Sequence, residues 1–179
     1  MREILIIGRG GQGAQTAGNL LAQAYFAEGQ FVQTFATYGG ARRGTPVTSS
    51  IRVDDQPIRL RCDIERADAM LCFDDTLLDQ GLLGRADDGT KIVVNSTRSS
   101  DAFSALGGYQ IVAFDGMEIA RRNEMGKVVN SALLGAFVAM LDDPGLETMC
   151  EVIEQTAPVK QQQNVAACRQ AYQQLRNPA

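Results

Sequence analysis

A strand–turn–helix pattern at the start of the chain limits its fold more than any other feature. Residues 3–7 are mostly β-branched and apolar, residues 8–13 read Gly-Arg-Gly-Gly-Gln-Gly, and residues 14–28 repeat apolar side chains at helical spacing. A short apolar run bounded by glycine is typical of a central strand buried on both faces. The glycines allow a tight turn and let the helix pack closely on the strand. This unit predicts an α/β fold with a Rossmann-like first turn.

The remaining sequence continues to alternate strand and helix patterns. Residues 47–53 and 57–62, joined by Asp54-Asp55-Gln56, predict an antiparallel hairpin. The other expected strands are residues 31–36, 69–73, 90–94 and 109–114, and the expected helices are residues 74–81, capped by Asp74 or Asp75, 98–106, 127–141, 146–155 and 160–176. We therefore expect one domain over residues 1–179. It is a three-layer α/β/α structure whose sheet is mainly parallel with one antiparallel hairpin.

The residue types exclude several kinds of catalytic and metal site. The chain has no histidine, so a Ser-His-Asp or Cys-His site cannot form within it. Its cysteines are isolated from one another and form no Cys-x-x-Cys pair: Cys62, Cys72, Cys150 and Cys168. Structural zinc and iron–sulfur clusters normally need clustered ligands. We expect no catalytic residue and no metal ligand on this chain.

The overall charge and the N-terminal sequence indicate which classes of partner this chain does not bind. The net charge is −4, whereas binding along a phosphate backbone needs a basic face, so nucleic acid is not expected. The chain runs directly into a strand pattern without a signal peptide, and its apolar runs are too short to span a membrane. A cytoplasmic protein that does not enter a membrane is the expectation.

The glycine-rich turn fits the pattern G-x-G-x-x-G, which alone does not define a ligand. A following helix offers free N–H groups and partial positive charge to an anion. NAD binding also needs an acidic residue about 20 residues further on, at the end of the second strand. That position falls in Gln33-Thr34-Phe35-Ala36, which contains no acid. Two interpretations of the turn therefore stay open. It either serves only to pack the helix on the strand, or it contacts a phosphate, a CoA-like ligand or a partner.

A second glycine-rich segment, Tyr38-Gly39-Gly40-Ala41-Arg42-Arg43-Gly44-Thr45, separates two expected strands. Arginine carries its donors in a rigid fork that suits carboxylate and phosphate groups. A solvated surface loop is one interpretation of this segment. Because glycines and an aromatic residue flank the arginines, we favour a shaped loop that contacts a ligand or a partner.

Several motifs in order resemble the gamma subunit of the 2-oxoacid:ferredoxin oxidoreductases. They are the G-x-G-G-Q-G turn, the Tyr-Gly and Arg-Gly pairs of the second loop, Arg52-Val53-Asp54-Asp55-Gln56-Pro57-Ile58, Ala67-Asp68, and Asn130-Ser131-Ala132-Leu133-Leu134-Gly135-Ala136. The resemblance extends from about residue 3 to about residue 140. The chain departs from it at Thr45, where many relatives carry a second glycine.

The resemblance implies a subunit of an enzyme that decarboxylates a 2-oxoacid, passes electrons to ferredoxin or to a flavin/NAD subunit, and transfers the acyl group to coenzyme A. Thiamine diphosphate, Mg²⁺ and [4Fe-4S] clusters would then belong to alpha, beta and delta-type partner subunits. This chain would support assembly and the access of substrate or CoA. The candidate contact residues are Gly8, Gly10, Gly11, Gln12, Gly13, Tyr38, Gly39, Arg42, Arg43 and Gly44. The alternative is a dinucleotide-binding oxidoreductase subunit, or a nucleotide-binding scaffold, that uses the Gly8–Gly13 turn.

Overall fold

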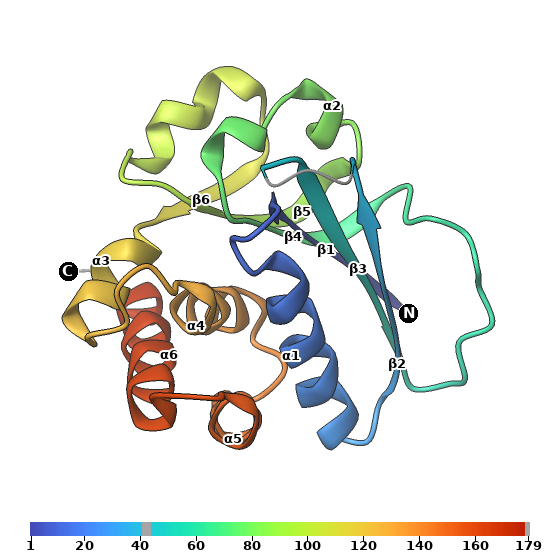
Figure 1. Ribbon diagram of the computed structural model, residues 1–179. Helices are drawn as coiled ribbons and strands as arrows, with labels where there is room; N and C mark the ends of the chain where they lie inside the picture. Colours follow the sequence, from blue (N-terminus) through green and yellow to red (C-terminus); the bar gives the residue numbers. More distant parts are fainter. Residues whose placement is uncertain (41–43, 178–179) are drawn as a thin grey trace.

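The computed structural model describes residues 1–40 and 44–177, which form a six-stranded sheet with helices on both faces (Figure 1). The strands are β1 (Arg2–Arg9), β2 (Phe31–Tyr38), β3 (Pro46–Asp54), β4 (Ala67–Cys72), β5 (Ala86–Asn95) and β6 (Gln110–Phe114). Their order across the sheet is β2-β3-β1-β4-β5-β6. β3 is antiparallel to both of its neighbours, and the pairs β1–β4, β4–β5 and β5–β6 are parallel.

The two faces of the sheet are covered by helices of different lengths. The helices are α1 (Ala14–Ala27), η1 (Asp75–Leu77), α2 (Gln80–Leu83), η2 (Ser100–Leu106), α3 (Gly116–Arg122), α4 (Asn130–Leu141), α5 (Leu146–Thr156) and α6 (Gln161–Arg176). α1, α4, α5 and α6 pack together on one side of the sheet, and α2 lies on the other (Figure 1). Ile4 and Ile6 of β1 face the first group, while Leu5 and Ile7 face the second. The predicted three-layer, mainly parallel architecture is confirmed.

The antiparallel hairpin forms at a different place from the predicted one. It joins β2 to β3 through residues 39–45, with Phe31 opposite Asp54 and Tyr38 opposite Val47. Residues 57–62, all of them described, form no strand. β1 already occupies the other edge of β3, pairing from Arg2 to Arg9, so β3 has no free edge for a returning strand.

The Asn130–Ala136 motif opens α4, which is buried on almost all sides because it lies between the sheet and α6. The Ser131 hydroxyl donates a 2.7 Å hydrogen bond to Oδ1 of Asn164 on α6. Gly135 lies so close to α6 that a Cβ atom there would stand 2.1 Å from the carbonyl oxygen of Cys168. A helix that is apolar all round needs a buried position, and Gly135 permits the close approach of α6.

Candidate functional site

The glycine-rich turn lies at the carboxyl end of β1, where the chain passes to α1 and β2 on one side while β4 lies on the other. In open α/β sheets this switch point is the usual place for a ligand. Gly11 and Gly13 have φ values of 96° and 93°, a left-handed conformation that glycine adopts without strain. Gly13 is also the N-cap of α1. A Cβ atom on Gly8 would stand 3.0 Å from Cβ of Ala14, so this glycine allows α1 to pack on β1.

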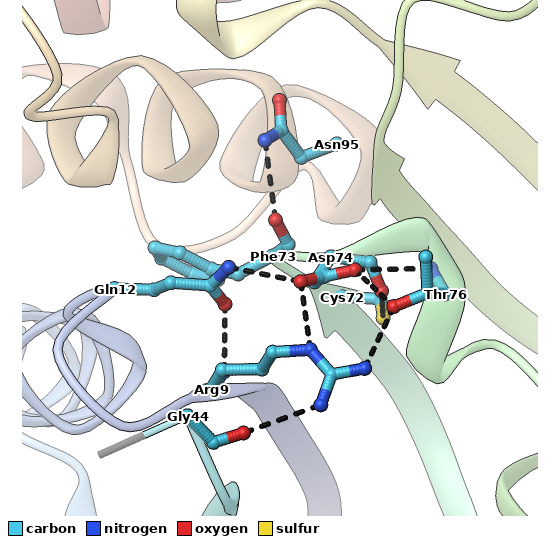
Figure 2. Close-up of polar contacts among 8 residues, drawn as sticks. All are labelled: Arg9, Gln12, Gly44, Cys72, Phe73, Asp74, Thr76 and Asn95. Carbon is cyan, nitrogen blue, oxygen red and sulfur yellow. Dashed lines mark hydrogen bonds and ion pairs between the residues drawn. The ribbon is translucent and has the colours of Figure 1, made fainter.

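Side chains of the turn form a polar network with the end of β4 (Figure 2). Nε of Arg9 donates to Oδ2 of Asp74 over 3.0 Å, and its NH2 group donates to Oγ1 of Thr76 over 2.8 Å. Nε2 of Gln12 donates to the same Asp74 oxygen over 3.0 Å, while Oε1 of Gln12 accepts from the backbone N–H of Arg9 over 2.6 Å. NH1 of Arg9 donates to the carbonyl oxygen of Gly44 in the second loop. The network therefore joins both predicted loops to β4.

Two groups at the end of β4 have altered acidity. Partial burial disfavours the ionised form of Asp74, but hydrogen bonds from Thr76 and Gln12 and the charge of Arg9 outweigh it and lower its pKa below 3.8. Burial raises the pKa of the Cys72 thiol to about 12, and the thiol donates a hydrogen bond to the Asp74 carbonyl oxygen. Cys72 is therefore a protonated, buried thiol at neutral pH and no nucleophile.

Replacing Asp74 with asparagine tests this network. Because the folded-state pKa lies below the ordinary value, ionised Asp74 stabilises the folded chain above about pH 4, and this contribution is lost as the pH falls through the folded-state pKa. We expect Asp74→Asn to lower the free energy of unfolding by about 1–2 kcal/mol at pH 7. The difference from wild type should shrink at pH 3, as urea unfolding at both pH values would measure. The exposed Asp88→Asn is the matched control; an equal loss for Asp74→Asn at both pH values would contradict the charge-based account.

A cleft of about 810 Å³ opens between the turn, the start of α1 and the second loop. Gly10, Gly11, Gly13 and Tyr38 of the predicted residues line it. The Tyr38 hydroxyl donates a hydrogen bond to Oε1 of Gln15 on α1, and the residue is 55% exposed. The structure therefore brings the turn and the first residue of the second loop to one cavity.

The other predicted site residues have different positions. Gly8 and Gln12 face the end of β4, where Gln12 belongs to the polar network. The Gly39 N–H donates to the Pro46 carbonyl oxygen over 2.8 Å and closes the base of the second loop, and Gly44 accepts from Arg9. Arg42 and Arg43 lie outside the described residues.

The sequence interpretation missed three residues at this site. Arg9 was interpreted only as a variable position of the G-x-G-x-x-G pattern, and Asp74 was interpreted only as a possible helix cap. The third is Asn130, whose side chain packs on Gly13: a Cβ atom at Gly13 would meet its Nδ2 and Oδ1 at 2.5 Å. The family-like motif at Asn130 was the available signal, but it did not indicate contact with the turn.

The described residues give little support for a resident nucleotide or metal. The segment Gln33-Thr34-Phe35-Ala36 lies within β2 and brings no carboxylate to its end, where NAD binding would need one for the ribose. Within the described ranges, no group of three or more His, Cys, Asp or Glu side chains could hold a metal ion. No helix among the described residues is long and apolar enough to cross a membrane.

Comparison with known proteins shows the family to which this chain is related. Residues 3–174 match the family described as pyruvate ferredoxin/flavodoxin oxidoreductase. The chain belongs to this family. It is 34% identical over 178 residues to the pyruvate synthase subunit PorC of Methanothermobacter thermautotrophicus, covering 98% of this chain and 96% of that one. It is 37% identical over 161 residues to the pyruvate/ketoisovalerate oxidoreductases common subunit gamma of Thermococcus kodakarensis, covering 87% and 86%.

A solved structure agrees with this membership. The pyruvate oxidoreductase subunit PORC of Thermotoga maritima superposes with a TM-score of 0.84 at 28% identity and covers 96% of this chain and 95% of that one. The predicted fold class and the resemblance to gamma subunits are thereby confirmed. The chain is a subunit of an oxidoreductase that acts on oxo groups, and neither an independent dinucleotide-binding subunit nor a nucleotide-binding scaffold is favoured.

Proposed function

We propose that this chain, as a single domain over residues 1–179, is the gamma subunit of a cytoplasmic multi-subunit enzyme that converts a 2-oxoacid and CoA into acyl-CoA and CO₂. Electrons pass to ferredoxin or to a flavin/NAD subunit. The observation that carries the proposal is the match to relatives named as gamma or PorC subunits along nearly their whole length. The partners are alpha, beta and delta-type subunits.

The donor groups of this chain fit a supporting role. Its four cysteines are free thiols, of which Cys150 and Cys168 are neighbours in the core, and its described side chains form no group of three or more that could hold a metal. In this proposal thiamine diphosphate, Mg²⁺ and [4Fe-4S] clusters therefore belong to the partner subunits. Those groups supply the decarboxylation and electron-transfer chemistry. This chain supplies a shaped surface around the cleft between the Gly8–Gly13 turn and the second loop.

The cleft has groups suited to an anion. α1 has Gly13 as its N-cap and no side-chain cap, and the first N–H groups of a helix have no partner within it. Arg42 and Arg43 lie in the second loop of the sequence. We assign this surface to a carboxylate or phosphate of a partner subunit, the oxoacid or CoA. Arg9 is not assigned to this anion, because its guanidinium already donates hydrogen bonds to Asp74, Thr76 and Gly44.

The choice of oxoacid lies outside this chain in our proposal. The relative from T. kodakarensis is named as a gamma subunit common to the pyruvate and ketoisovalerate oxidoreductases, a name that fits a subunit shared by enzymes for two oxoacids. In our proposal the partner subunits select the oxoacid, and this chain only closes or approaches their active site.

Gentle purification of the tagged chain from its native host tests the proposal. Mass spectrometry should find a thiamine-binding chain and a ferredoxin-like chain in a fixed ratio to this one. A panel of 2-oxoacids with CoA and a viologen dye should then reveal acyl-CoA formation by the complex. Recovery of this chain alone, or only with further copies of itself, would refute the proposal.

A further inference from the structure

Strand β2 forms one edge of the sheet, and no other strand pairs with its outer side (Figure 1). It pairs with β3 along all eight residues without a bulge, a length of about 27 Å. It contains no charged residue and no proline. Among the described residues, no backbone hydrogen bond joins β2 to any strand or loop other than β3. Natural proteins usually shorten, charge, bulge or cover such an edge, because it can pair with another chain.

The opposite edge of the sheet shows the contrast. β6 has five residues, and the N–H of Ala113 donates to Oγ of Ser100 over 3.0 Å. One of its outward groups is thus already satisfied within the chain. β2 instead exposes Phe31 by 46% and Tyr38 by 55% at its two ends. β2 is therefore the longer edge, it carries no charge, and it has an exposed aromatic residue at each end.

An apolar and basic segment borders this edge. Residues 57–61 run beside the first half of β2, where Nε2 of Gln33 donates to the Leu60 carbonyl oxygen over 2.8 Å. A groove of about 440 Å³ lies between them, and Arg61 lines it. Among the described residues, no carboxylate lies within 4 Å of Arg59 or Arg61. The edge therefore combines free backbone groups, apolar side chains and two arginines without an acidic partner.

We propose that an extended segment of another subunit of the oxidoreductase, apolar and bearing carboxylates, adds a strand to the sheet at β2. Backbone pairing would satisfy the outward groups of β2, as in other cases of strand addition, and the carboxylates would pair with Arg59 and Arg61. This inference rests on the proposed function, because it requires a partner subunit.

A second copy of this chain suits the edge less well. Antiparallel pairing of two β2 strands about a two-fold axis sets Phe31 of one copy near Tyr38 of the other. Arg61 would then approach the end of β2 that leads in the sequence to Arg42 and Arg43, and residues 31–45 contain no acid. The like charges favour an acidic partner of different sequence.

Hydrogen–deuterium exchange of the purified complex tests the added strand. In an uncovered edge strand, alternate amides point outward and exchange quickly. We expect all the β2 amides in the complex to exchange about as slowly as those of β4, the internal reference for the folded sheet. Fast exchange of alternate β2 amides in an assembled complex would refute the added strand while leaving the proposed function intact.

Charge reversal tests the arginines. Arg59→Glu and Arg61→Glu should each weaken the binding of this chain to the remaining subunits about fivefold to tenfold, and less at high salt. The matched control is Lys127→Glu, which makes the same charge change at an exposed residue before α4 and should alter binding less than twofold. Equal weakening by all three variants would refute a local acidic partner.

The remaining outcomes are also decisive. Concentration-dependent slowing of β2 exchange in the purified chain alone would identify a second copy as the occupant and overturn the inference. If no other subunit is recovered with the chain, the proposed function and this inference fail together.

Discussion

Replacing Gly135 with alanine is expected to lower the free energy of unfolding of this chain by about 2–3 kcal/mol and its Tm by about 5–10 °C. Alanine normally favours a helix by about 1 kcal/mol over glycine, so the sign of the expected effect comes from packing. The new Cβ would stand 2.1 Å from the carbonyl oxygen of Cys168 and 2.9 Å from its Cα. Both are backbone atoms of α6, so no side-chain rotation relieves the contact. The helices α4 and α6 would have to separate.

A second glycine provides the control for this prediction. Gly89 lies in β5, and a Cβ atom there would meet nothing within 4 Å, so Gly89→Ala should change the free energy of unfolding by less than about 0.5 kcal/mol. Urea unfolding of the three proteins measures both effects. If Gly135→Ala is as harmless as Gly89→Ala, the close approach of α4 and α6 is not required for stability.

The central strands could be predicted because burial on both faces leaves a local signal. β1, β4 and the second half of β5 are apolar runs, which predict a strand without any information about its neighbours. The pairing of β3 with β2 had no such signal. The short turn Asp54-Asp55-Gln56 predicts a hairpin more strongly than the longer loop at residues 39–45, so the sequence favoured the wrong partner. Insertion of β3 between β1 and β2 is decided by long-range packing.

The expected helix at residues 74–81 is two short helices for a local reason. Oδ1 of Asp74 accepts from the Thr76 N–H and starts η1, and Oδ1 of Asp79 accepts from the Leu82 N–H and starts α2. The prediction that Asp74 or Asp75 caps the segment is confirmed for Asp74. The second cap was not recognised, although aspartate favours helix N-termini. α3 was missed as well, and Asp115 caps it by accepting from the Glu118 N–H.

Only the backbone conformation of the candidate site could be predicted from the sequence, and its side-chain contacts could not. The glycines of the turn are visible in the sequence because the conformation of the turn requires them. Arg9 and Asp74 are distant in sequence and meet because β1 and β4 are parallel neighbours with Ile7 opposite Cys72, so both side chains follow at the same edge of the sheet. Side-chain networks of this kind depend on strand order, which a single sequence does not reveal.

Replacing Arg42 and Arg43 together with alanine in the assembled oxidoreductase is expected to cause the largest functional loss, a KM for CoA or for the oxoacid that rises about tenfold or more. The loop that carries them is tethered at both ends, by Gly39 to Pro46 and by the Gly10 N–H to the Thr45 carbonyl oxygen. The carboxylate of Asp74, at the end of β4, is engaged by Arg9, Gln12 and Thr76. A charge-assisted contact with an arginine contributes about 1.5–3 kcal/mol, which sets the expected change.

The kinetic pattern of this double variant identifies the anion. A higher KM for CoA indicates a CoA phosphate, a higher KM for the oxoacid indicates its carboxylate, and weaker assembly with unchanged constants indicates a partner subunit. Lysine at both positions keeps the charge but loses the fork of donors, so it should restore only part of the loss. Arg121→Ala with Arg122→Ala removes the same charge from the exposed surface of α3 and is the matched control. If the Arg42/Arg43 variant assembles normally and keeps both KM values, these arginines bind neither ligand nor partner.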